Sequence, residues 1–180
     1  MALLLCSPAL HAANDFDKVL SLQGVSFHVT CPNSSSINQL TISPSGLTID
    51  NSIIEQKIEG VVTGAEIADI NSDGSPEIYV YVTSVGSGSY GELIAYSSNN
   101  KKSISGIYLA QLEYDSINSQ GYMGHDTFSI TGNSLRRQFP VYRQGDTNAH
   151  PSGGLRRLQY KLFAGEASWQ LKLTDSTLLQ

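Results

Sequence analysis

Residues 86–91 read Gly-Ser-Gly-Ser-Tyr-Gly and contain the S-G-x-Y sequence Ser87-Gly88-Ser89-Tyr90. Two β-like runs flank this segment, which predicts a loop between two strands. The glycines keep the backbone thin, the serine hydroxyls can donate and accept hydrogen bonds, and the tyrosine ring is a stiff anchor. Such a loop is better suited to entering a narrow cleft of another protein than to catalysis of its own.

The same segment matches the spacing of a dinucleotide-binding fingerprint, through Gly86, Gly88 and Gly91. That motif functions because its last glycine opens a helix whose N-terminus binds the pyrophosphate. Here the β-rich run Glu-Leu-Ile-Ala-Tyr-Ser follows at residues 92–97. We therefore do not expect a nucleotide. We expect no other cofactor either.

Carboxylate and amide side chains alternate between Asp69 and Glu77, with glycine in the sixth position. A calcium loop formed by Asp69, Asn71, Asp73 and Glu77 is one interpretation, although its twelfth position holds valine in place of the usual bidentate glutamate. In the other interpretation, which we favour, the first three side chains accept backbone N–H groups in a hairpin turn.

The sequence does not indicate an enzyme. Neither Ser87 nor Ser89 lies in a G-x-S-x-G nucleophile elbow. The histidines are too scattered for a typical metal site, and we expect His125 to have a structural hydrogen-bonding role. No catalytic residue is assigned.

Composition favours a single globular domain with a protein partner. The chain has 180 residues and a formal net charge of −5. This charge argues against a general nucleic-acid binder and favours approach to a basic protein. Six of the 11 basic residues gather late in the chain, and we interpret them as a solvated strand face, with a binding patch as the alternative: Arg136, Arg137, Arg143, Arg156, Arg157 and Lys161.

The N-terminus predicts export. Residues 1–13 resemble the latter part of a secretory signal peptide, with small residues at Ala12 and Ala13 for cleavage. Residues 14–180 then form the mature domain. Loss of Cys6 with the signal would leave Cys31 alone, as a small buried hydrophobe. No later run approaches the roughly 18 apolar residues of a membrane span.

Alternation of apolar and polar residues dominates the mature chain and predicts strands. Residues 110–124 lack a clear period and leave room for a helical turn. Closely spaced strands without an amphipathic helix favour antiparallel pairing. We therefore expect an all-β fold, an antiparallel β-sandwich of about ten short strands with one or two short helical turns. The expected strands are 26–30, 39–43, 46–50, 61–70, 78–83, 92–97, 105–112, 127–130, 135–141, 158–163 and 169–173.

Beyond the S-G-x-Y sequence, an ordered set of segments resembles the bacterial periplasmic inhibitors of i-type (invertebrate) lysozyme. The resemblance covers roughly residues 27–171. Its segments are Ala68–Ala95, Gly121–Asp126, Phe139–Tyr142, Gly145–Asn148 and Gly153–Arg156 leading to Tyr160.

This resemblance implies a β-sandwich that acts in the periplasm of Gram-negative bacteria and protects peptidoglycan from lysozyme, a function in evasion of host defence. It implies that Ser87, Gly88, Ser89 and Tyr90 bind in the active-site cleft. The S-G-x-Y loop is shared with inhibitors of c-type lysozyme, so a c-type or g-type target remains open, and a homodimer is compatible with the family. The candidates for secondary contacts are Tyr122, His125 and Arg143.

Two other interpretations remain. A secreted calcium-binding or carbohydrate-binding β-sandwich module would use the Asp69–Glu77 loop and the nine tyrosines. A hydrolase would turn over peptidoglycan without any lysozyme present.

Overall fold

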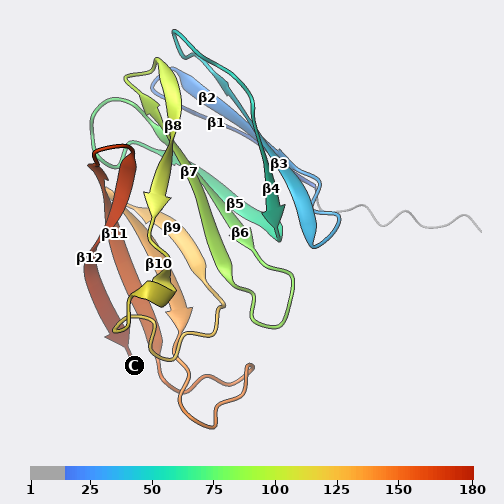
Figure 1. Ribbon diagram of the computed structural model, residues 1–180, viewed down its shortest axis with the longest axis vertical. Helices are drawn as coiled ribbons and strands as arrows, with labels where there is room; N and C mark the ends of the chain where they lie inside the picture. The colour runs from blue at the N-terminus through green and yellow to red at the C-terminus, as the bar shows by residue number, and fades with distance from the viewer. Residues whose placement is uncertain (1–14) are drawn as a thin grey trace, which may run out of the picture.

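The computed structural model describes residues 15–180, and its regular structure is almost entirely β-strand (Figure 1). Within these residues the one helical element is a short 3-10 turn, η1 (Leu112–Tyr114), which lies in the stretch without a clear period. The strands are β1 (Phe16–Leu22), β2 (Val25–Cys31), β3 (Ile37–Ser45), β4 (Ile54–Glu59), β5 (Val61–Ala68), β6 (Glu77–Thr83), β7 (Gly91–Asn99), β8 (Ser103–Leu109), β9 (Thr127–Thr131), β10 (Ser134–Pro140), β11 (Leu155–Ala164) and β12 (Trp169–Leu179).

The strands form two sheets. One has the order β1-β2-β3-β4, and the other has the order β5-β6-β7-β8-β12-β11-β10-β9. In Figure 1 they make three layers, with β5–β8 between β1–β4 on one side and β9–β12 on the other. The strand pairs are antiparallel except for β8 and β12, which run parallel where residues 107–109 face residues 169–171.

The middle layer is buried on both faces, and β6 shows this most clearly. Ile78, Val80 and Val82 enter a first core, which packs against the four-stranded sheet. Tyr79 and Tyr81 point the other way into a second core, which is shared with β10, β11 and β12. A half-buried strand would expose one of these two sets, so both faces of β6 contribute to folding.

The eight-stranded sheet curls until its two edge strands approach one another. Glu66 on β5 accepts a hydrogen bond from the backbone N–H of Ile130 on β9 at 3.1 Å. The same carboxylate accepts one from the Tyr81 hydroxyl at 2.8 Å, and the Tyr81 ring stacks on Phe128 at 5.7 Å. The second core is thereby enclosed almost as in a barrel.

The predicted all-β, antiparallel sandwich is confirmed apart from the parallel β8–β12 pair, with twelve strands in the described residues where about ten were expected. The strand predicted at residues 46–50 is wrong. Instead of joining a ladder, this segment donates backbone hydrogen bonds to the Lys101 and Lys102 carbonyls, and the Asn51 side chain caps Leu47. Strands β1 and β4 were missed because polar residues interrupt their alternation.

The predicted signal segment at residues 1–13, with Cys6, lies outside the described residues. Cys31 is buried in the first core as a free thiol. Between residues 15 and 180 there is no helix with the length and apolar character needed to cross a membrane.

The double burial of β6 leads to a stability prediction. Val80→Ala should lower the free energy of unfolding by about 2–4 kcal/mol, because it opens a cavity between two packed layers. The matched change Val19→Ala removes the same methyl groups from a side chain that is 64% exposed, and should cost less than about 0.5 kcal/mol. Chemical denaturation measures both values, and equal losses would contradict the burial of Val80 in the first core.

Candidate functional site

The S-G-x-Y sequence lies in the loop that joins β6 to β7, at the lower right of the middle layer in Figure 1. Two hydrogen bonds close its base. The Ser84 N–H donates to the Tyr90 carbonyl at 2.9 Å, and the Tyr90 N–H donates to the Ser84 hydroxyl at 2.8 Å. The loop therefore begins and ends on a fixed frame, and β7 follows where a dinucleotide-binding motif would need a helix.

Within the loop the tyrosine ring folds back over a glycine. A Cβ atom on Gly88 would lie 2.4 Å from Cε2 of Tyr90, so a residue with a side chain would displace the ring. Ser89 has a φ of 44° and bonds to the Gly86 carbonyl through both its N–H and its hydroxyl. The Ser87 hydroxyl is exposed and has no hydrogen-bond partner among residues 15–180.

Two other segments, one at residues 124–125 and one at Asn148, hold the backbone of the loop. The His125 N–H donates to the Gly88 carbonyl at 2.8 Å, and a Cβ on Gly124 would lie 1.9 Å from that oxygen. The Asn148 side-chain amide donates to the Ser87 carbonyl, while its oxygen lies 3.1 Å from Nε2 of His125. The structure therefore gives His125 the hydrogen-bonding role that we expected of it.

The base of the loop is held by a buried polar cluster around Asp126. Its carboxylate accepts hydrogen bonds from the Gly91 N–H at 2.8 Å, the Tyr122 hydroxyl at 2.6 Å and Nε of Arg137 at 2.6 Å. Arg137 is 5% exposed and also donates to the Tyr122 hydroxyl at 2.8 Å. Because these donors converge on it, the buried carboxylate is well satisfied.

The electrostatics of the cluster follow from burial and pairing. Burial disfavours the charged guanidinium, yet the pKa of Arg137 is raised, because Asp126 attracts it and accepts its hydrogen bond. Burial, together with the bond to Asp126, raises the pKa of Tyr122. The Arg137 guanidinium therefore stays charged and the Tyr122 hydroxyl stays neutral at physiological pH.

Aromatic contacts connect the cluster to the loop tip. Tyr122 packs edge-on to Phe139 in the second core at 4.7 Å and edge-on to Tyr90 at 5.7 Å. The Arg137 guanidinium lies 5.2 Å from the centre of the Tyr122 ring. These contacts thus run without a break from Phe139 in the second core through Tyr122 to Tyr90.

The structure brings most of the predicted residues together at one end of the molecule. Tyr122 and His125 contact the loop, with Tyr122 beneath it as a positioning residue. Arg143 is exposed in the segment between β10 and β11, where its N–H donates to Asp146 at 2.7 Å.

Sequence reasoning missed the roles of Asp126, Arg137 and Asn148. Asp126 and Asn148 lay inside segments that carried the family resemblance, so their position there was the one available signal. Arg137 was interpreted as part of a solvated strand face, which is wrong for this residue, because it points into the second core and pairs with Asp126. Arg136, Arg156 and Arg157 are half-buried, and Arg143 and Lys161 are exposed.

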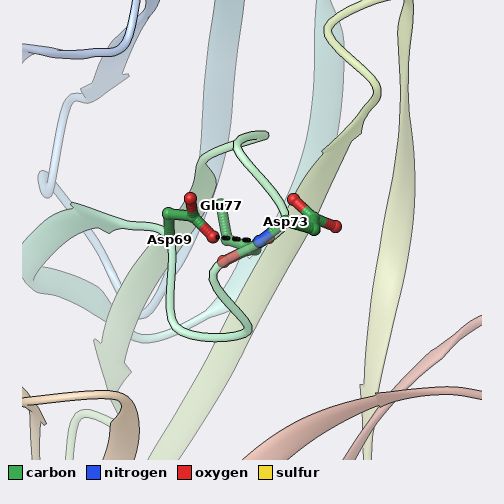
Figure 2. A group of neighbouring side chains, drawn as sticks. All are labelled: Asp69, Asp73 and Glu77. Carbon is green, nitrogen blue, oxygen red and sulfur yellow. Dashed lines mark hydrogen bonds between the residues drawn. The ribbon is translucent and has the colours of Figure 1, made fainter.

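The Asp69–Glu77 loop is organised by its own backbone. Figure 2 shows the Asp69 carboxylate facing the backbone nitrogen of Asp73, which donates to it at 3.0 Å. Asp69 also accepts from Gly74 at 2.9 Å, and Asp73 accepts from the Ser75 N–H at 2.8 Å. Carboxylate oxygens of Asp69, Asp73 and Glu77 lie within 4.8 Å of one another. Since the aspartate oxygens already accept these N–H groups, the bonding matches the capped turn that we favoured.

Glu77, at the start of β6, is fully buried. It accepts hydrogen bonds from the Ile70 N–H at 3.1 Å and, more weakly, from the hydroxyls of Tyr79 and Ser97 at 3.4 Å. Burial, together with repulsion from Asp73 and Asp69, raises the pKa of Glu77 to about 8. The carboxyl group is therefore largely protonated at neutral pH.

The close approach of Gly124 to the loop can be tested with a matched glycine. Gly124→Ala should destabilise the protein and speed amide hydrogen exchange in residues 84–91, because the new methyl group displaces the Gly88 carbonyl. Gly132→Ala introduces the same methyl group at another positive φ, with nothing within 4 Å, and should cost only the backbone strain of about 1–2 kcal/mol. Equal amide exchange rates in residues 84–91 of the two variants would argue against a role of the Gly124 contact in holding the loop.

The buried Glu77 predicts a pH dependence of stability. Its pKa is higher in the folded chain, about 8, than the ordinary value of 4.5. The folded state therefore binds the proton more tightly, and stability should fall as the pH rises from 4.5 to 8, by up to about 1.4 kcal/mol per pH unit.

Glu77→Gln removes the titrating group and should flatten this part of the profile. Glu55→Gln, at an exposed position on β4, should leave the slope intact. Denaturant unfolding at several pH values measures the difference, and an unchanged slope in the Glu77 variant would refute the assignment.

Comparison with known proteins agrees with the sequence resemblance. No curated protein and no solved structure matches the chain. Residues 49–119 match the family described as periplasmic lysozyme inhibitor of I-type lysozyme, and this segment runs from before β4 to beyond η1, including the S-G-x-Y loop. That description names a periplasmic inhibitor. Over residues 49–119 the match confirms the resemblance to the periplasmic inhibitors of i-type lysozyme.

Proposed function

We propose that this protein inhibits i-type lysozyme in the periplasm by inserting the Ser87-Gly88-Ser89-Tyr90 loop into the active-site cleft of the enzyme. One observation carries the proposal. The loop presents an exposed Ser87 hydroxyl that has no hydrogen-bond partner among residues 15–180, while Asn148 holds the Ser87 carbonyl and His125 holds the Gly88 carbonyl. The family match covers this segment and supports the choice of partner.

The chemistry of a glycosidase cleft suits this loop. Such a cleft places two carboxyl groups on either side of the bond to be cleaved. The Ser87 hydroxyl can donate a hydrogen bond to one of these carboxylates, and bonds to charged acceptors are about twice as strong as neutral ones. Ser89 is less available, because its hydroxyl bonds within the loop at 3.3 Å.

Tyr90 supplies the apolar part of the contact. The residue is 48% exposed, although one side of its ring rests on Gly88 and an edge meets Tyr122. Burying the exposed part against the enzyme would remove apolar surface from water and leave the hydroxyl free to find a polar group. Tyrosine is among the residues most often responsible for binding energy at protein interfaces.

Rigidity makes the loop an efficient inhibitor. Ordering a mobile loop on binding costs free energy, and a loop that is already ordered avoids that cost. Here the Ser87 and Gly88 carbonyls accept hydrogen bonds from Asn148 and His125, and the Gly91 N–H donates one to the Asp126 carboxylate. The net charge of −5 would also speed encounter with a basic lysozyme, less so at high salt.

The two recognition residues can be tested separately. Tyr90→Ala should weaken inhibition by about 2 kcal/mol or more, roughly 30-fold. Ser87→Ala should weaken it by about 1.5–3 kcal/mol, because a hydrogen bond to a charged group is lost. Inhibition of lysis of a cell suspension by i-type lysozyme measures both effects.

Ser89→Ala is the matched control, since it removes a hydroxyl from the same loop that is already bonded internally, and it should have the smallest effect. A c-type lysozyme assayed in parallel identifies the enzyme class. Failure of the unmodified protein to inhibit either enzyme would refute the function. Full inhibition by the Ser87 and Tyr90 variants would refute only the role of the loop.

A further inference from the structure

A groove opens beside the loop where β8 leaves β7. The two strands pair only between residues 96–99 and residues 103–106, and β8 then turns to pair with β12. The gap between the separated strands forms a cavity of about 430 Å³, bounded by the base of the loop, the end of β8 and η1. Its volume lies within the range of about 300–1,000 Å³ that is usual for small-molecule sites.

The mouth of the groove carries exposed aromatic and acidic side chains. Tyr108 is 56% exposed on β8, and Tyr90 lies across from it at the end of the loop. Glu92 and Glu113 also line the cavity and are exposed. Partial burial, together with repulsion from Glu59, raises the pKa of Glu92.

The floor is aromatic and contains one buried cation. Tyr122 and Phe128 line it together with Arg137, which is 5% exposed. The Arg137 guanidinium lies 5.2 Å from the centre of the Tyr122 ring and 5.4 Å from that of Phe128, and Asp126 fixes its position. The floor is therefore already rigid before any ligand enters.

We propose that this groove binds a neutral saccharide, about one or two sugar rings of a glycan chain. A sugar ring has an apolar C–H face that can stack on Tyr108 or Tyr90, and hydroxyl groups around its edge. These hydroxyls can donate to Glu92 and Glu113 and accept from Arg137. Walls that are mostly apolar and aromatic, with a small number of convergent polar groups, are typical of a ligand site.

Charge selects against the other ligands. The carboxylates at the mouth oppose an anion, and the Arg137 guanidinium on the floor, whose charge is paired with Asp126, presents N–H donors that a cation cannot accept from. A purely apolar side chain would leave the carboxylates and the guanidinium partly desolvated without partners. An uncharged polyhydroxylated ring satisfies all of these groups, and the proposal does not depend on inhibition of lysozyme.

The test uses the trimer of N-acetylglucosamine as the probe and ligand-observed NMR at millimolar concentrations, with no lysozyme present. The unmodified protein should bind the trimer. Tyr108→Ala should weaken binding by about tenfold, because one stacking surface is lost. Glu113→Ala should weaken it by several-fold through the loss of a hydroxyl acceptor.

Tyr114→Ala is the matched control, since this neighbouring tyrosine is 82% exposed and does not line the groove. It should bind as the unmodified protein does, and thermal unfolding verifies that every variant is folded. Absence of binding by the unmodified protein, or equal binding by all variants, would overturn the proposal. Loss of lysozyme inhibition in the Tyr108 variant without any saccharide binding would also overturn it, and would assign the groove to the protein interface.

Discussion

The burial of β6 on both of its faces is the constraint on which the rest of this structure depends. Its isoleucine and valines fill one core and its tyrosines fill the other. A shift of pairing by one residue would exchange these sets, placing aromatic rings where aliphatic side chains fit. The register of the middle layer is therefore strongly specified. Because the S-G-x-Y loop begins directly after β6, its position relative to both cores is specified as well.

Asp126 is the second constraint on the position of the loop, and burying its charge costs electrostatic free energy. A buried ion pair stabilises a protein only when its hydrogen-bonding groups are satisfied, because both charges lose their hydration. Here the carboxylate joins Arg137 of β10, Tyr122 and the N–H of Gly91 at the start of β7. The cluster thus ties the outer layer of the curled sheet to the base of the loop. An apolar replacement could fill the same space, but it could not hold the backbone of Gly91.

The sequence predicted the local features well and the long-range ones poorly. Alternation predicted most strands, and the glycines and serines predicted the loop, because these signals depend on neighbouring residues. Arg137 looked like a solvent-facing residue, since nothing in its neighbourhood along the chain reveals the partner eleven residues away. The burial of β6 on both faces was also missed. In the alternating run Ile-Tyr-Val-Tyr-Val, the isoleucine and valines predict one buried face, whereas tyrosines are compatible with a face that is partly exposed. Only the curling of the eight-stranded sheet, which no local pattern encodes, decides where those tyrosines lie.

Tyr90 belongs both to the loop and to the groove, and this shared position couples the two proposed ligands. Its exposed surface cannot be buried by an enzyme cleft and by a sugar ring at the same time, unless both ligands contact different sides of the ring. One side is already occupied by Gly88 and one edge by Tyr122, so little free surface remains to be divided. A saccharide stacked on Tyr90 would then weaken binding of the enzyme, and the enzyme would weaken binding of the saccharide by the same factor. If the saccharide stacks on Tyr108 alone, that coupling disappears, and the groove could hold a glycan while the loop occupies the cleft.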